Sequence, residues 1–160
     1  MSRVSIIMGS ASDLNTVSEA INVFREFDVD FEVKILSAHR TPKELCQYVE
    51  ASTRKGVKAF IAAAGGAAAL AGVVAAHTIV PVIGIPIETS SLKGIDSLLS
   101  TVQMPGGVPV ASMAIGKAGA KNAALFVLEI LGLVDKKIQA KLCAYKNKMR
   151  VKIKNTKIKL

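Results

Sequence analysis

Residues 57–87 read VKAFIAAAGGAAALAGVVAAHTIVPVIGIPI and, apart from Lys58, contain no charged side chain. A run of this length would suffice to span a membrane. The paired glycines, the two internal prolines and the excess of Ala over Leu argue against a span. The segment divides instead into two strand-like runs, 57–63 and 81–87, on either side of a helical pattern at 66–77. The stretch therefore predicts a strand, a helix and a second strand.

The same alternation continues along the rest of the chain. Repeated βα units predict an α/β fold with a central parallel sheet, helices on both faces and ligands bound beyond the carboxyl ends of the strands. The other predicted strands are 3–8, 30–36 and 108–115, and the other predicted helices are 13–27, 42–55 and 117–131.

Size and composition favour one compact core. The chain has 160 residues, of which 51% are hydrophobic, and this length is typical of a single domain. Aromatic residues make up only 4% and Trp is absent, which argues against a platform that stacks nucleic-acid bases. The predicted core is aliphatic.

The net charge of +9 is confined to one end. After Asp135 the chain has ten Lys or Arg residues, among them Lys159, and no acid. The first 135 residues hold the other 11 basic residues against all 12 acidic ones. We therefore expect one α/β domain over 1–135 and a basic C-terminal helix and tail over 136–160. We interpret that tail as solvated charge and do not expect nucleic acid as a partner.

The two cysteines, Cys46 and Cys143, lie far apart without a CxxC motif, so we expect reduced thiols. No Cys/His or Ser/His/Asp nucleophile arrangement is evident, and His77 is interpreted as structural. No set of carboxylates suits a metal. The N-terminus lacks the features of a signal peptide, so a cytoplasmic protein is expected.

The segment GSASD (9–13) follows the first predicted strand. Ser10 and Asp13 fit a capping box, so a plain helix start would explain both residues. In the alternative interpretation, Gly9 permits close approach, and Ser10, Ser12 and the free amides bind an anion such as phosphate. Asp13 would then accept hydrogen bonds from sugar hydroxyls or an amine. The segment is neither a P-loop nor a dinucleotide fingerprint.

The segment SAHRTP (37–42) follows the second predicted strand. Thr41 as N-cap, Pro42 at the first helical position and Glu44 as capping-box partner account for a helix start. His39 and Arg40 have no such role. An arginine fork suits phosphate, and histidine suits proton transfer near neutral pH. Two interpretations remain for the pair by itself: an incidental surface pair, or a site for a phosphorylated ligand that exchanges a proton.

The segment AGGAAALAG (64–72) follows the third predicted strand and has almost no side-chain bulk. Small residues at such a turn let a flat ligand lie against the backbone, whose amides supply polar contacts. Close helix packing in an oligomer core explains the same residues, and both interpretations can hold together. The predicted helix 117–131 is apolar over most of its surface, which favours subunit contacts.

Four motifs together, GSASD, SAHRTP, AGGAAALAG and VQMPGGVPVASMAIGKAGAKNAA, resemble the class I N5-carboxyaminoimidazole ribonucleotide mutase family (PurE) of purine biosynthesis. The resemblance spans roughly residues 3–131. It implies a flavodoxin-like three-layer α/β/α subunit, assembled as an octamer, that moves a carboxyl group from the exocyclic nitrogen to carbon 4 of an aminoimidazole ribonucleotide. It also implies no metal or organic cofactor, and a functional link to the synthetase that makes the substrate.

The resemblance also implies roles for individual residues. Ser10, Ser37 and Arg40 correspond to phosphate contacts, Asp13 to the ribose contact and His39 to the proton-transfer residue. The remaining positions line the imidazole and the carboxylate with their backbone: Ala64, Gly65, Gly66 and Ala67.

One motif departs from the family pattern. Class I sequences usually read GGAAHLPG where this chain reads GGAAALAG, so Ala69 and Ala71 replace a histidine and a proline. Class II relatives, which carboxylate aminoimidazole ribonucleotide directly with carbon dioxide, lack that histidine too. They typically carry SAHKT and AGRSN, which this chain does not. Class I is the main hypothesis, and direct carboxylation or a ribonucleotide-binding homologue with impaired catalysis are the alternatives.

Overall fold

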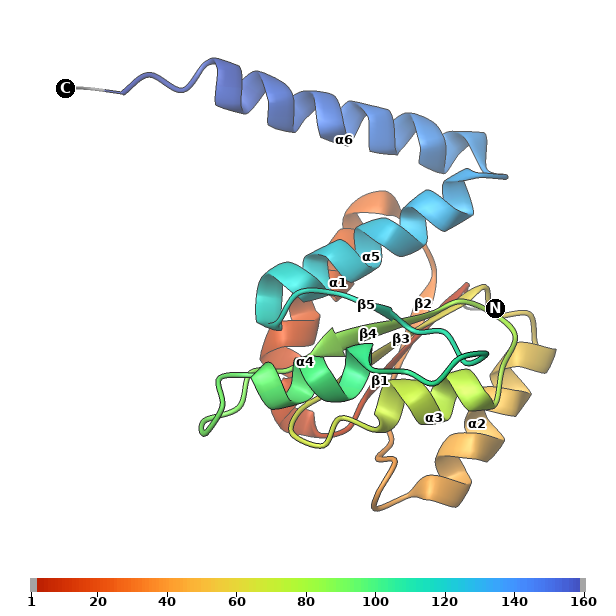
Figure 1. The fold of residues 1–160 in the computed structure, drawn as a ribbon. Coiled ribbons are helices and arrows are strands. Elements are labelled where there is room, and N and C mark those ends of the chain that lie inside the picture. The colour runs from red at the N-terminus through yellow and green to blue at the C-terminus, as the bar shows by residue number, and fades with distance from the viewer. Residues whose placement is uncertain (1–2, 159–160) are drawn as a thin grey trace. The chain divides into compact units, whose positions relative to one another are not determined.

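The structure, a computed structural model, describes residues 3–158 and contains a five-stranded parallel sheet in the order β2-β1-β3-β4-β5 (Figure 1). This is the doubly wound order of flavodoxin-like proteins. Met8 pairs with Ile35 of β2 and with Ala63 of β3, so these strands end together at the carboxyl edge. The strands are β1 (Val4–Met8), β2 (Phe31–Ile35), β3 (Ala59–Ala64), β4 (Val82–Pro86) and β5 (Ala111–Ser112).

Helices connect successive strands in the right order for βα units (Figure 1). A short 3₁₀ turn, η1, precedes the first of them. The helical elements are η1 (Ala11–Asp13), α1 (Leu14–Phe27), α2 (Pro42–Arg54), α3 (Leu70–Ala76), α4 (Ile95–Val102), α5 (Gly116–Gly132) and α6 (Lys136–Lys154). The predicted α/β fold, the parallel sheet and the strand-helix-strand interpretation of 57–87 are confirmed. Among the described residues, no helix is long and apolar enough to cross a membrane.

Sequence analysis missed α4. Its inner side carries buried hydroxyl residues, Ser97 and Thr101, whereas Ile95 and Leu99 are about half exposed. The helix is thus polar toward the core and apolar toward solvent, the reverse of the pattern by which surface helices are found.

Two predicted elements are shorter than expected. The strand predicted over 108–115 pairs only at Ala111 and Ser112, because Pro109 cannot donate to the sheet and β5 lies at an edge. The helix predicted from residue 66 begins at Leu70, because Gly66 turns the chain with a φ of 68°.

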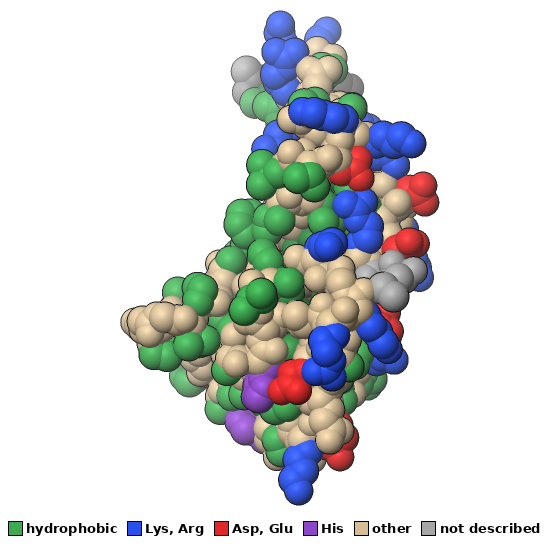
Figure 2. All heavy atoms as spheres, turned by 90° about the vertical axis from the view of Figure 1, so that its right-hand side faces the viewer, with side chains coloured by type: hydrophobic (Ala, Val, Ile, Leu, Met, Phe, Trp, Pro, Cys, Tyr) green, Lys and Arg blue, Asp and Glu red, His purple; other side chains and the backbone are tan. Residues whose placement is uncertain are grey.

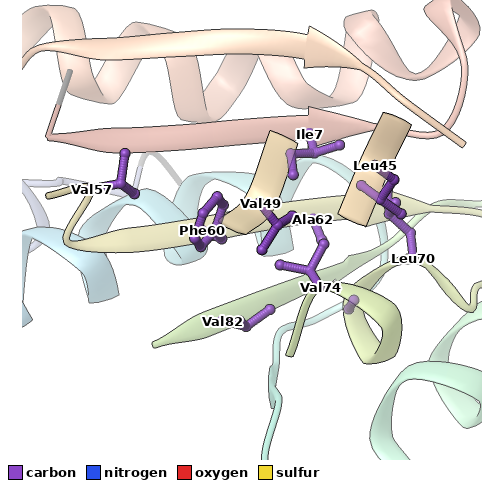
Figure 3. Packing of buried hydrophobic residues seen from close by; sticks show 10 residues of the cluster. Ile7, Leu45, Val49, Val57, Phe60, Ala62, Leu70, Val74 and Val82 are labelled. Carbon is purple, nitrogen blue, oxygen red and sulfur yellow. The ribbon is translucent and has the colours of Figure 1, made fainter. Parts of the chain in front are cut away.

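One face of the sheet packs against α2 and α3 (Figure 3). Small residues on the strands, such as Ala62, let the helices approach closely, and Phe60 fills the space between them. On the opposite face lie α1, with Phe24 and Val17 fully buried, and the first part of α5 (Figure 1). The α2/α3 core comprises Ile7, Leu45, Val49, Val57, Phe60, Ala62, Leu70, Ala71, Val74 and Val82.

The chain forms two compact units, Met1–Leu125 and Phe126–Leu160. In the second unit, Asp135 caps α6 by accepting hydrogen bonds from the N–H groups of Lys137 and Ile138. An ion pair of 2.7 Å joins Lys146 Nζ to Glu129 Oε1. The basic segment that the charge pattern defines lies within this unit.

Lys and Arg side chains gather over α6 (Figure 2). Of the ten basic residues after Asp135, only Lys159 lies outside the described residues.

The close packing of α4 on β4 yields a stability prediction. A Cβ on Gly84 would collide with Thr101 Cγ2 and come within 3.2 Å of Val110 Cγ1. Gly84→Ala should lower the free energy of unfolding by about 1 to 3 kcal/mol because the packed layer cannot absorb a methyl group. Gly106→Ala is the matched control, since nothing lies within 4 Å of its Cβ position. Equal denaturation midpoints for both variants would contradict this packing.

Candidate functional site

The loops after β1, β2 and β3 surround a cavity of about 430 Å³ at the carboxyl edge of the sheet. The site lies where the chain order reverses between β1 and β3, the usual ligand position in open α/β sheets. Predicted site residues that line the cavity are Ser10, Asp13, Ser37, His39, Arg40, Ala64 and Gly65. Predicted site residues that do not line it are Ser12, Gly66 and Ala67. Cavity-lining residues outside the predicted set are Gly9, Ala38, Ala68, Ala69 and Leu70.

The loop after β1 is a capping box, as its sequence predicts. Asp13 Oδ2 accepts a hydrogen bond from Ser10 N–H at 3.2 Å, and Ser10 Oγ accepts one from Ser12 N–H at 3.3 Å. The exposed Ser12 hydroxyl donates to Ser10 Oγ at 2.8 Å and to Asp13 Oδ1 at 3.3 Å. Ser12 therefore supports the other two side chains from outside the cavity. Because Ser10 Oγ accepts both bonds, its own proton can point to a ligand.

Ser37 organises the SAHRTP turn. Its hydroxyl oxygen accepts hydrogen bonds from His39 N–H at 3.3 Å and from Arg40 N–H at 3.2 Å. Thr41 is the N-cap residue of α2, but its side chain makes no capping bond. Its hydroxyl instead accepts from Ser37 N–H at 2.8 Å and donates to Ser37 C=O at 3.2 Å. The predicted role of the Thr41 side chain in capping is therefore wrong, and Pro42 at the helix start is confirmed.

Arg40 joins two of the loops. Its Nη2 donates to Gly9 C=O at 2.9 Å, and its Nε donates to Ser37 Oγ at 3.4 Å. These bonds fix the guanidinium plane at the cavity wall, and its remaining N–H groups can serve a ligand. His39 is exposed and lines the same cavity. The turn therefore places the His39 imidazole and the Arg40 guanidinium at the same cavity.

Asp13 is the acidic group of the cavity and is only 7% exposed. Its burial raises the pKa of the carboxyl group. The Ser12 hydroxyl, the Ser10 N–H and the Arg40 charge oppose this effect without cancelling it. A buried carboxylate beside an arginine suits recognition of hydroxyl or amine donors on a ligand.

The loop after β3 is held by α4, the helix that sequence analysis missed. Gly66 N–H donates to Ser97 Oγ at 2.9 Å, and Ser97 Oγ donates to Ile87 C=O at 2.7 Å. Gly66 C=O accepts from Ser100 Oγ at 3.3 Å. Both backbone groups of Gly66 therefore bond to side chains of α4, whereas the family resemblance implies that they line the imidazole and the carboxylate of a substrate. Ala64 and Gly65 remain on the cavity wall.

Within residues 3–158, no group of three or more His, Cys, Asp or Glu side chains could hold a metal ion. The chemistry that the cavity offers is instead that of hydroxyl, guanidinium, imidazole and carboxylate groups. The strand order and this cavity together define a flavodoxin-like α/β protein with a ligand-sized site, lined by polar and small apolar residues, at its switch point.

Comparison with known proteins identifies the family. The AIR carboxylase family profile matches residues 3–152. A Pyrococcus abyssi protein named N5-carboxyaminoimidazole ribonucleotide mutase is 52% identical over 150 residues, which cover 94% of this chain and 85% of that protein. An Escherichia coli protein of the same name is 49% identical over 140 residues, covering 88% and 83% of the two chains. The chain therefore belongs to the AIR carboxylase family.

A solved structure agrees with this assignment. The crystal structure of Treponema denticola PurE matches with a TM-score of 0.86 at 28% sequence identity. The match covers 94% of this chain and 92% of that one. The flavodoxin-like subunit and the family that the four motifs indicate are both confirmed.

The raised pKa of Asp13 yields a pH-dependent prediction. The pKa of Asp13 is higher in the folded protein than in the unfolded chain. The free energy of unfolding therefore falls as the pH rises through the range in which this carboxyl group ionises. Asp13→Asn keeps an acceptor oxygen and removes that cost, so its melting temperature should exceed the wild-type value at neutral pH. The difference should shrink as the pH falls below the range in which the wild-type carboxyl group ionises. Thermal melts across that range test this, and a lower melting temperature for Asp13→Asn at neutral pH would contradict it.

Proposed function

We infer that this protein is an N5-carboxyaminoimidazole ribonucleotide mutase of de novo purine biosynthesis. The observation that carries the inference is the presence of Ser10, Asp13, Ser37, His39 and Arg40 around one cavity. Relatives with this name are about half identical over most of the chain, which supports the assignment. The enzyme converts its substrate to the isomer carboxylated at carbon 4.

The phosphate end of the substrate is assigned to Ser10, Ser37 and Arg40. The guanidinium supplies charge and several donors, and the two hydroxyls add hydrogen bonds. Asp13 is assigned to the ribose hydroxyls, which can donate to its oxygens. This assignment puts the aminoimidazole ring toward the small residues after β3, where Ala64, Gly65 and Ala68 line the wall.

The reaction proceeds by decarboxylation and recarboxylation. Loss of carbon dioxide from the exocyclic nitrogen leaves an electron-rich aminoimidazole, whose carbon 4 then attacks the carbon dioxide. A small closed site makes recapture effectively unimolecular. The proton on carbon 4 must then leave, and a proton must reach the nitrogen. His39 is the proposed carrier because imidazole exchanges protons near neutral pH.

Ala69 distinguishes this chain from the usual family pattern. It lines the cavity, so the methyl group stands where the class I pattern has an imidazole. Ala71, in place of proline, is buried within the α2/α3 core. Compared with the usual histidine, the methyl side chain of Ala69 offers no polar contact, and the cavity stays open. Direct carboxylation of aminoimidazole ribonucleotide by carbon dioxide is therefore kept as the second candidate, with an impaired ribonucleotide-binding homologue as the third.

A product assay separates these candidates. The purified chain is incubated with N5-carboxyaminoimidazole ribonucleotide or, separately, with aminoimidazole ribonucleotide plus bicarbonate. We expect efficient formation of the carbon-4 carboxylated product from the first substrate alone. Preference for the second pair would identify a direct carboxylase. Binding of the ribonucleotide without product in either reaction would identify a homologue that has lost catalysis.

Two substitutions in one turn separate chemistry from binding. His39→Asn should lower kcat by a factor on the order of 10² or more, because it removes the proposed proton carrier. Arg40→Ala should mainly raise KM, because it removes a phosphate contact. Steady-state kinetics measure both, and unchanged melting temperatures show that folding is spared. Near-normal kcat for His39→Asn would exclude His39 from proton transfer, and an unchanged KM for Arg40→Ala would count against the phosphate assignment.

We also propose that the enzyme works as a homo-oligomer, an octamer as the family resemblance implies. Four apolar side chains line one side of α4 and the turn before it, each about half exposed, and association would remove them from water. They are Leu92, Ile95, Leu99 and Val102. Sedimentation of the full chain should give one species with the mass of an octamer, and a stable monomer at micromolar concentration would contradict this.

The remaining context is proposed on the same basis. The catalytic function is assigned to residues 1–135, and the basic segment after Asp135 is assigned no nucleic-acid partner. The reaction takes place in the cytoplasm, where a synthetase supplies the carboxyamino substrate.

A further inference from the structure

A second cluster of reactive side chains lies outside the cavity. Cys46 Sγ is 3.1 Å from His77 Nε2, and His77 Nδ1 is 3.1 Å from Glu50 Oε1. The imidazole therefore contacts the thiol through one ring nitrogen and the carboxylate through the other. None of the three residues lines the cavity of the proposed active site. The sequence shows no Cys/His nucleophile arrangement, because these two residues are 31 positions apart and meet only in the folded chain.

The packing of α2 on α3 builds this cluster. Cys46 and Glu50 are four residues apart on α2 and so lie on one side of it. His77 is the residue that ends α3. A second contact next to the cluster holds the same two segments together, since the hydroxyls of Thr53 and Thr78 are 2.8 Å apart. The position of His77 at the end of α3 and the contact between Thr53 and Thr78 thus both place the imidazole next to α2.

The chemistry of the partners fixes the proton on the imidazole. The carboxylate of Glu50 can only accept, so His77 Nδ1 carries the proton and donates it. In the neutral ring Nε2 then has a free lone pair, which faces the Cys46 thiol. Arg54 Nη1 lies 4.0 Å from the other oxygen of Glu50. His77 can therefore accept the thiol proton, and Glu50 can stabilise the imidazolium that results.

Exposure distinguishes Cys46 from an inert core cysteine. The adjacent Leu45 is fully buried, whereas Cys46 is partly exposed and the His77 side chain is 36% exposed. A metal site is a poorer explanation, because the two ring nitrogens of His77 point to different partners. A partly exposed thiol beside an imidazole is the environment of reactive cysteines.

We propose that Cys46 is an activated thiol that forms mixed disulfides with low-molecular-weight disulfides, with His77 as its base and Glu50 as a positioning residue. The Cys46 proton moves to His77 Nε2, and the sulfur attacks one sulfur of the disulfide. The S–S bond of the reagent breaks, and its other half leaves as a thiolate. The reagent disulfide is the oxidant, and no further reactant is needed.

Reaction kinetics of the full-length chain test the role of His77. In the Cys143→Ser background, Cys46 is the one remaining thiol. Its rate with 5,5′-dithiobis(2-nitrobenzoate) at neutral pH should fall about tenfold on His77→Asn and about threefold on Glu50→Gln. If His77 acted only by packing, its removal would uncover the thiol and speed the reaction. An unchanged or faster rate for His77→Asn would therefore overturn the proposal.

A matched control and a second readout complete the test. In the Cys46→Ser background, the rate of Cys143 should not change on His77→Asn. Glutathione disulfide is then incubated with the unmodified chain, and peptide mass spectrometry locates the adduct. We expect a glutathione adduct on the peptide containing Cys46. Absence of that adduct would refute the proposal even if the His77 variant failed to fold.

Discussion

The need to cover both faces of β3 and β4 governs this fold. Every residue of β4 and nearly every residue of β3 is buried, so neither strand can present a side to water. Helices must therefore pack on both faces, and right-handed βα crossovers are the connections that achieve this. Parallel strands end at one edge, and the loops that follow them must meet there. The position of the cavity is a consequence of how the strands are covered.

Hydrogen bonds from side chains connect these loops and hold them in a defined conformation. Arg40 joins the loop after β2 to the carbonyl at the end of β1, and Ser97 joins the loop after β3 to the end of β4. Each tie also satisfies backbone groups that the sheet leaves unpaired at this edge. The ligand-facing groups are thereby held on rigid supports, which is what positioning of a small substrate requires.

The same two helices connect both reactive regions of the molecule. The turn with His39 and Arg40 leads into α2, and the small-residue loop leads into α3. Farther along, these helices meet again at Cys46 and His77. Leu45 of α2 and Leu70 of α3 both belong to the core that these helices share. A modified Cys46 would therefore lie on α2, the helix that follows the turn with His39 and Arg40.

The sequence alone determined the class of fold, because short β-branched or apolar runs alternating with helical patterns have few other stable arrangements. It also indicated most of the cavity, since Ser10, Asp13, His39 and Arg40 stand at strand ends in motifs of high specificity. Only the tertiary structure decided that Gly66 faces α4, that Ser12 lies outside the cavity and that Cys46 meets His77. These outcomes depend on contacts between residues distant in sequence. The contact of Gly66 in particular could not be predicted, because α4 is polar toward the core and its sequence lacks the usual amphipathic pattern.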